Sequence, residues 1–78
     1  MTEQVIEITK SILAEAFNRT ADEIELDSTI GTSPYWDSLG HMRLILLIEE
    51  KYSVELSPDQ ILELRSFKAI NSLLSNLM

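Results

Sequence analysis

Residues 36–52 decide how this chain folds, and they read WDSLGHMRLILLIEEKY. Asp37 and Ser38 are both residue types that satisfy the free backbone amides at the start of a helix. The residues that follow carry apolar side chains at helical spacing. The stretch therefore predicts a helix that begins at Ser38 and runs to about Tyr52.

This helix has two apolar faces when its side chains are placed at 100° per residue. One face is expected to point to the core and consists of Leu44, Ile45, Ile48 and Tyr52. The opposite face consists of Leu39, Met42 and Leu46, bordered by the charged residues Arg43, Glu49 and Glu50. An apolar strip with charged borders, turned away from the core, predicts a surface that docks on another protein.

Three further helices are expected on either side of the central one. Apolar residues at steps of three and four predict a first helix from a cap at Thr2 to near Asn18. Ser57 and Pro58 begin a short third helix, with Gln60 completing a capping box and Ile61, Leu62 and Leu64 supplying apolar contacts. Ser66 caps the last helix, whose apolar stripe is Phe67, Ile70, Leu73, Leu74 and Leu77.

A long connection over residues 19–37 separates the first two helices. Thr20 and Glu23 fit a capping box for a single turn, and Ile24, Leu26 and Ile30 are spaced as apolar anchors. An ordered connection of this length is unusual in so small a domain and suggests a function.

Length and charge exclude several classes of protein. With 78 residues the chain is expected to form one domain, residues 1–78, with room for one modest core and no deep substrate pocket. A net charge of −7 opposes binding to nucleic acid, and the absence of cysteine excludes disulfides and thiolate metal sites. The longest apolar run, Leu44 to Ile48, is far too short to span a bilayer, so no membrane insertion and a cytoplasmic location are expected.

The hydroxyl of Ser38 is expected to lie exposed at the junction of a loop and a helix. A phosphate attached there meets the unpaired amides of the first helical turn and the positive end of the helix dipole. The plainer interpretation is that Ser38 only caps the helix, as serine commonly does.

The residues Asp37-Ser38-Leu39, followed by Met42, Leu44, Ile48, Glu49, Glu50 and Tyr52, resemble the attachment motif and second helix of acyl carrier proteins and the related peptidyl and D-alanyl carriers. The resemblance extends over essentially the whole chain. It implies an all-α, four-helix acyl-carrier-like bundle with a long first loop and a short third helix. It also implies that Ser38 carries a 4'-phosphopantetheine arm, which a phosphopantetheinyl transferase attaches from coenzyme A, and that the chain itself catalyses nothing.

The resemblance also assigns partner-binding roles. Asp37 matches the aspartate that the transferase recognises, although capping of the helix is a compatible role. The positions that contact partner enzymes in the family correspond here to Leu39, Met42, Arg43 and Leu46, and the acidic pair corresponds to Glu49 and Glu50. These partners are an enzyme that loads an acyl or aminoacyl thioester and a downstream transferase or synthase. Association is expected to be weak, fast and sensitive to salt, and the carrier is expected to be a monomer.

Three departures from the family pattern narrow the biological role. Gly40 stands where fatty-acid carriers usually have an acidic residue, Arg43 replaces a usual glutamate, and Trp36 replaces a small residue. They favour a specialised pathway, such as polyketide or nonribosomal peptide assembly, aminoacyl transfer or polysaccharide modification, over primary fatty acid synthesis.

Other functions remain open at this stage. The main alternative is an unmodified helical adaptor that binds a protein through the Leu39, Met42 and Leu46 face. A hydrolase is a weaker one, because no strand and no Gly-x-Ser-x-Gly pattern precedes the serine, and His41 falls toward the core, where packing is the expected role. A calcium loop over residues 22–27 is excluded, because Ile24 and Leu26 stand where oxygen ligands or glycine are needed.

Overall fold

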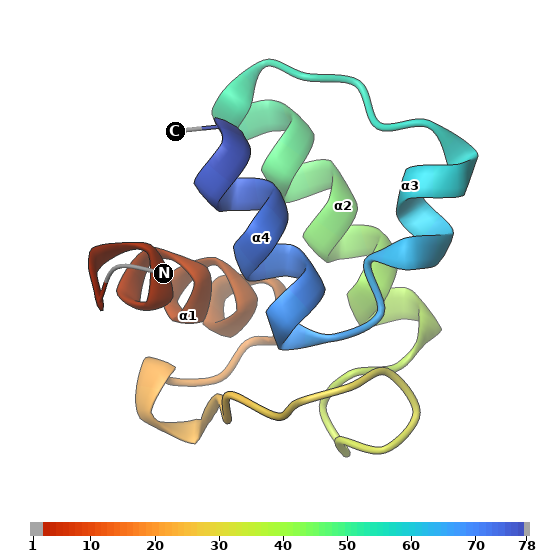
Figure 1. The fold of residues 1–78 in the computed structure, drawn as a ribbon. Helices are drawn as coiled ribbons and strands as arrows, with labels where there is room; N and C mark the ends of the chain where they lie inside the picture. The colour runs from red at the N-terminus through yellow and green to blue at the C-terminus, as the bar shows by residue number, and fades with distance from the viewer. Residues whose placement is uncertain (1–2, 78) are drawn as a thin grey trace.

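Five helical segments make up the computed structural model, which describes residues 3–77 (Figure 1). They are α1 (Glu3–Phe17), the 3₁₀ turn η1 (Ala21–Glu23), α2 (Ser38–Tyr52), α3 (Pro58–Glu63) and α4 (Phe67–Leu77). The described residues contain no β-strand, so the prediction of an all-α bundle with a long first loop and a short third helix is confirmed. The cap predicted at Thr2 lies outside the described residues.

The core forms where α1 packs against both α2 and α4. Its central side chains, each with no exposed surface, are Leu13, Leu44, Ile48, Ile70 and Leu74. Burial of one such side chain stabilises the fold by about 1.5–3 kcal/mol. The face of α2 that the helical spacing assigned to the core is thus the face that packs on α1.

One buried polar contact joins α1 to α4. The Thr9 hydroxyl lies 2.7 Å from Oδ1 of Asn71 and 2.8 Å from the carbonyl oxygen of Val5, and neither Thr9 nor Asn71 is exposed to solvent. Buried polar groups cost free energy unless they are hydrogen-bonded. This contact therefore fixes one register between the first and last helices.

The long loop is joined to the segment between α3 and α4. The Ile30 amide donates to the Arg65 carbonyl at 3.0 Å, and the Phe67 amide donates to the Ser28 carbonyl at 2.9 Å, on either side of an antiparallel bridge between Thr29 and Ser66. These bonds fix the middle of the loop, a part that belongs to no helix or strand.

The loop anchors are only partly those that were expected. Ile24 is buried, but Leu26 is 56% exposed, so its prediction as an anchor was wrong. A turn in which the Ser28 amide donates to the Glu25 carbonyl carries Leu26 outward and brings Ser28 inward instead.

The helix α3 is the most lightly packed of the four. It stands at the edge of the bundle away from α1 (Figure 1), none of its own residues is buried, and Leu56 and Leu64 hold it from either side. The Ser57 amide donates to Gln60 Oε1 at 3.0 Å and Ser57 Oγ accepts from the Gln60 amide at 3.2 Å, which confirms the capping box. Leu62 is 68% exposed, so its predicted apolar contact was wrong: six residues turn too little surface inward to bury every leucine.

Candidate functional site

The site is built around the first turn of α2, where Asp37 provides the cap and Ser38 is left free. Oδ1 of Asp37 accepts a 2.7 Å hydrogen bond from the Gly40 amide, and the Asp37 carbonyl accepts from the His41 amide at 2.9 Å. The exposed Ser38 hydroxyl makes no hydrogen bond with residues 3–77. Division of the two roles between neighbouring residues leaves this oxygen available for covalent modification.

The residues around Ser38 fit a phosphodiester. The amides of Ser38 and Leu39 belong to the first turn, where no preceding helical carbonyl can accept from them. They sit at the positive end of α2, a helix of 15 residues, so an anion there is favoured. The neighbouring Asp37 carboxylate opposes a second negative charge, but its bond to the Gly40 amide turns one oxygen toward the helix.

Trp36 and His41 form a buried bridge beneath this turn. The Trp36 indole donates from Nε1 to Nδ1 of His41 at 3.1 Å, and the two rings stack with their centroids 6.1 Å apart. Because an indole N–H can only donate, Nδ1 must accept, which leaves the proton on Nε2 to donate to the Ile61 carbonyl at 3.1 Å. His41 therefore uses both ring nitrogens to hold the fold together, and its predicted packing role is confirmed.

Gly40 is explained by the same aromatic cluster. A β-carbon at this position would lie 3.0 Å from Cδ1 and 3.1 Å from Cε1 of Phe17, whose ring packs on Trp36 with centroids 5.3 Å apart. An acidic side chain cannot enter here without displacing the ring. The departures at Gly40 and Trp36 thus have one structural cause, the packing of both residues against the Phe17 ring. In the sequence they stand as two separate departures.

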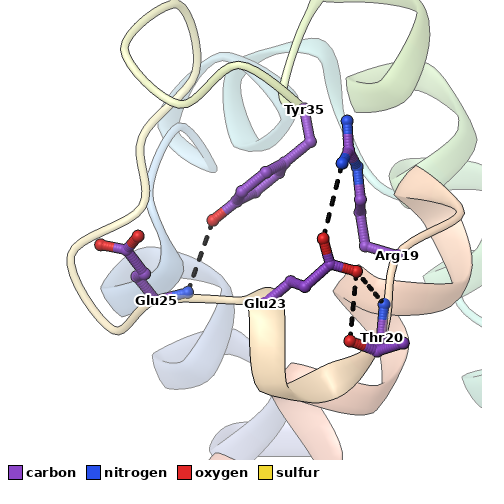
Figure 2. Close-up of polar contacts among 5 residues, drawn as sticks. All are labelled: Arg19, Thr20, Glu23, Glu25 and Tyr35. Atoms are coloured by element: carbon purple, nitrogen blue, oxygen red, sulfur yellow. Dashed lines mark hydrogen bonds and ion pairs between the residues drawn. The ribbon is translucent and has the colours of Figure 1, made fainter.

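A polar corner at η1 fixes the start of the loop (Figure 2). Glu23 Oε1 accepts from the Thr20 amide at 3.0 Å and from the Thr20 hydroxyl at 3.1 Å, and its other oxygen lies 3.5 Å from the Arg19 guanidinium. These hydrogen bonds from Thr20, assisted by Arg19, lower the pKa of Glu23 below its ordinary value of 4.5. The Tyr35 hydroxyl accepts from the Glu25 amide at 3.4 Å, which connects this corner to the end of the loop that leads into α2.

The outward face of α2 carries the predicted docking residues. Leu39, Met42 and Leu46 are 62%, 48% and 59% exposed, so the assignment of the two helix faces is confirmed. Arg43 and Glu50 are also exposed, and neither forms an ion pair within the described part of the chain.

Glu49 has a structural contact that the sequence did not reveal. Its Oε2 accepts a 2.9 Å hydrogen bond from the Leu56 amide, and the side chain is half-buried. This carboxylate closes the connection between α2 and α3. The only sign of this contact in the sequence is a glutamate that stands one turn before the end of a helix and is followed by an irregular connection.

A cleft opens beside the first turn of α2. It is lined by Ile30, His41, Ile61, Leu62 and Arg65 and has a volume of about 250 Å³. A second cleft of about 250 Å³ lies between α1, the loop and α4 and is lined by a separate set of residues, Ile6, Leu26, Phe67, Lys68 and Asn71.

The protein is a small helical bundle in which the exposed Ser38, free of hydrogen bonds to residues 3–77, begins α2. Its histidine is held within the fold by two hydrogen bonds. These are features of a carrier domain. The family model described as phosphopantetheine attachment site matches residues 7–74. The chain belongs to this family. It is a carrier with a covalent 4'-phosphopantetheine prosthetic group, which works with a phosphopantetheinyl transferase and acyl-handling enzymes and is not itself catalytic.

No curated protein matches the chain. Within residues 3–77, no helix is long and apolar enough to cross a membrane, and no group of three or more His, Asp or Glu residues is placed to hold a metal ion.

Proposed function

We propose that Ser38 is the attachment residue and that the chain carries an acyl or aminoacyl thioester at the end of the arm. The observation that supports this is the exposed, unbonded Ser38 hydroxyl at the capped start of α2. The arm supplies the thiol that holds the cargo. The chain's own residues position the phosphodiester: the first-turn amides of α2 stabilise its charge, and Asp37 holds that turn in place.

Co-expression with a broad-specificity phosphopantetheinyl transferase tests this proposal by intact mass. Wild-type protein is expected to gain the mass of one phosphopantetheine group, and Ser38→Ala is expected to gain none. Ser72→Ala is the matched control, because Ser72 is an exposed serine on α4. Full modification of Ser38→Ala would disprove the assignment. No mass gain by wild type with several transferases would favour the unmodified adaptor.

We propose that the transferase recognises Asp37, in addition to the role of Asp37 as the cap of α2. Asp37→Asn separates the two roles, because asparagine keeps an oxygen acceptor for the Gly40 amide and caps helices about as well as aspartate. The variant is expected to melt close to wild type and to be loaded about tenfold more slowly, as for loss of a charged contact. Equal loading rates for the variant and wild type would mean that Asp37 only caps α2 and is not recognised by the transferase.

Leu39, Met42, Arg43 and Leu46, together with Glu49 and Glu50, are proposed to form the surface that binds the transferase, the loading enzyme and the downstream transferase or synthase. The exposed leucines and Met42 can contact a partner because their side chains do not pack in the core. Glu50 is the freer acidic residue, because Glu49 is bonded to the Leu56 amide. Met42→Ala is expected to slow transfer to a partner with little change in thermal stability; strong destabilisation would contradict this assignment.

The departures from the family pattern support a specialised pathway over primary fatty acid synthesis. Arg43 stands exposed at the border of the apolar stripe, where it opposes a partner surface that is uniformly basic. We also propose that residues 1–78 work as one domain, as a monomer in the cytoplasm, where coenzyme A is available. An adjacent gene for an adenylating enzyme would point to an amino acid cargo.

A further inference from the structure

The chain on both sides of Ser38 packs on one aromatic ring, that of Phe17. Tyr35 and Trp36 precede the serine, and their ring centroids lie 5.6 and 5.3 Å from that of Phe17. Beyond the serine, a β-carbon at Gly40 would lie 3.0 Å from Cδ1 of the same ring. Ser38 itself is exposed and its hydroxyl is unbonded within residues 3–77, so the place of this hydroxyl depends on contacts that its neighbours make.

Side chains have to hold the segment before α2, because the backbone of residues 31–36 is bonded only locally. The Gly31 amide donates to the Trp36 carbonyl at 3.1 Å, and the Trp36 amide donates to the Ser33 carbonyl at 3.1 Å. The Ser33 amide donates to the Thr29 carbonyl at 3.0 Å. Within the described chain, no backbone hydrogen bond joins residues 31–36 to a helix. The direction in which the segment enters α2 is therefore set by its side chains.

Tyr35 holds this segment with its hydroxyl as well as with its ring. The Glu25 amide donates to the Tyr35 hydroxyl at 3.4 Å (Figure 2), and the hydroxyls of Tyr35 and Ser28 are hydrogen-bonded to each other. The single proton of the Ser28 hydroxyl is donated to the Glu25 carbonyl, so Tyr35 donates its own proton to Ser28 Oγ. Ser28 is only 2% exposed, so this acceptor is shielded from water.

Ser28 is in turn fixed to the last helix. Its carbonyl accepts from the amide of Phe67, the first residue of α4, at 2.9 Å. The bond between Tyr35 and Ser28 thus connects the start of α4 to a residue three positions before the proposed attachment point. The Trp36 indole bonds to His41, which belongs to α2 itself, so that bond does not orient the segment against α4.

We propose that Tyr35 is a positioning residue for the attachment reaction: its hydrogen bond to Ser28 sets the direction in which the Ser38 hydroxyl meets the transferase. The inference rests on the proposed attachment at Ser38. In that reaction the Ser38 oxygen forms a bond to the phosphorus that carries the pantetheine group, and the diphosphate bond of coenzyme A breaks with the nucleotide as leaving group. The hydroxyl proton passes to a base of the transferase. Such an attack depends on alignment, since a misplacement of about 1 Å can slow a reaction about a hundredfold.

Initial rates of attachment test this, with full-length apo protein, coenzyme A and a broad-specificity phosphopantetheinyl transferase, over a range of carrier concentrations. Tyr35→Phe keeps the ring beside Phe17 and removes the hydroxyl. Its kcat is expected to fall about fivefold, as for loss of one hydrogen bond, while its KM for the carrier stays within about twofold of wild type because the docking face of α2 is unchanged. A merely structural role would act the other way: a smaller folded fraction lowers the effective carrier concentration, which raises KM and leaves kcat unchanged.

Tyr52→Phe is the matched control, because Tyr52 is the other of the chain's two tyrosines and lies at the far end of α2 from Ser38. Both of its constants are expected to equal those of wild type. Ser28→Ala is expected to lower kcat about as much as Tyr35→Phe, and the double variant is expected to lose no more, because both changes remove the same bond.

An unchanged kcat for Tyr35→Phe, with or without a raised KM, would overturn the inference. Losses that add in the double variant would also overturn it, since the two residues would then act independently. Intact mass separates the inference from the proposed function. If wild type gains one phosphopantetheine group and Tyr35→Phe reacts with the same kcat, the inference alone fails, whereas a wild type that gains none refutes the attachment on which it rests.

Discussion

Replacement of His41 by Phe removes the buried bridge and keeps a ring of similar shape. The change leaves the Trp36 indole N–H without an acceptor, and Trp36 is only 1% exposed. An unsatisfied buried donor costs about 1–3 kcal/mol, while the Ile61 carbonyl can turn to water at less cost. The expected loss is about 2 kcal/mol, a large part of the roughly 3–5 kcal/mol that a domain of this size has.

Urea unfolding followed by circular dichroism measures this loss. With a slope of about 1 kcal/mol per M, the midpoint is expected to fall by about 2 M at unchanged slope. Met42→Phe makes the same type of replacement on the exposed face and is expected to change stability by less than about 0.5 kcal/mol. In a Trp36→Phe background, where the donor is already gone, His41→Phe is expected to cost about 1 kcal/mol less.

Two results would refute this reasoning. One is a midpoint for His41→Phe within about 0.5 M of wild type, which would mean that the two hydrogen bonds contribute little. The other is an unchanged cost in the Trp36→Phe background, which would mean that the hydrogen bond from the Trp36 indole does not contribute to the effect of His41.

Gly40→Asp is expected to lower the urea midpoint by about 1 M, because its β-carbon would lie 3.0 Å from the Phe17 ring, which then has to shift by a few tenths of an ångström; an unchanged midpoint would mean that the ring shifts without cost. Glu49→Gln is expected to destabilise by about 1 kcal/mol through its weakened bond to the next connection, and Glu50→Gln by less than about 0.5 kcal/mol, in the same assay; equal effects would contradict the different roles given to the two residues. Because the pKa of Glu23 is lowered in the folded state, its contribution to stability is present above pH 4.5 and is lost as the pH falls through the folded pKa. Thr20→Ala removes the hydroxyl and keeps the backbone amide, so it is expected to raise the pKa of Glu23 part of the way toward 4.5 in an NMR titration of the carboxyl group; an unmoved titration would show that the hydrogen bond from the hydroxyl does not act on it.

The helices could be predicted from the sequence because each begins with a local signal and continues with a periodic one. Ser57 followed by Pro58 and Gln60 fixes the start of α3 without reference to the rest of the chain. The spacing along α2 separates Leu44 from Leu46 by face, and the exposure of these two residues agrees. Ser38 could be singled out for the same reason, since a helix start is a local feature.

Contacts that depend on the path of the loop could not be predicted. Leu26 is exposed because the hydrogen bond from the Ser28 amide to the Glu25 carbonyl sets the direction of a turn. The spacing of apolar residues in the sequence does not predict this turn. The bridge from Trp36 through His41 to Ile61 joins three segments, so only the packed fold brings its atoms together. Arg65 comes to line the cleft beside the first turn of α2 for the same reason, and no motif marks it.

The bridge between Thr29 and Ser66 has a consequence for synthesis on the ribosome. The segment that leads to the serine takes its final path only when residues 65–67 are available to receive its hydrogen bonds. A nascent chain that has emerged only as far as α2 presents Ser38 on an unfinished loop. For the proposed attachment at Ser38, the transferase therefore meets the finished loop only after residues 65–67 have been synthesised.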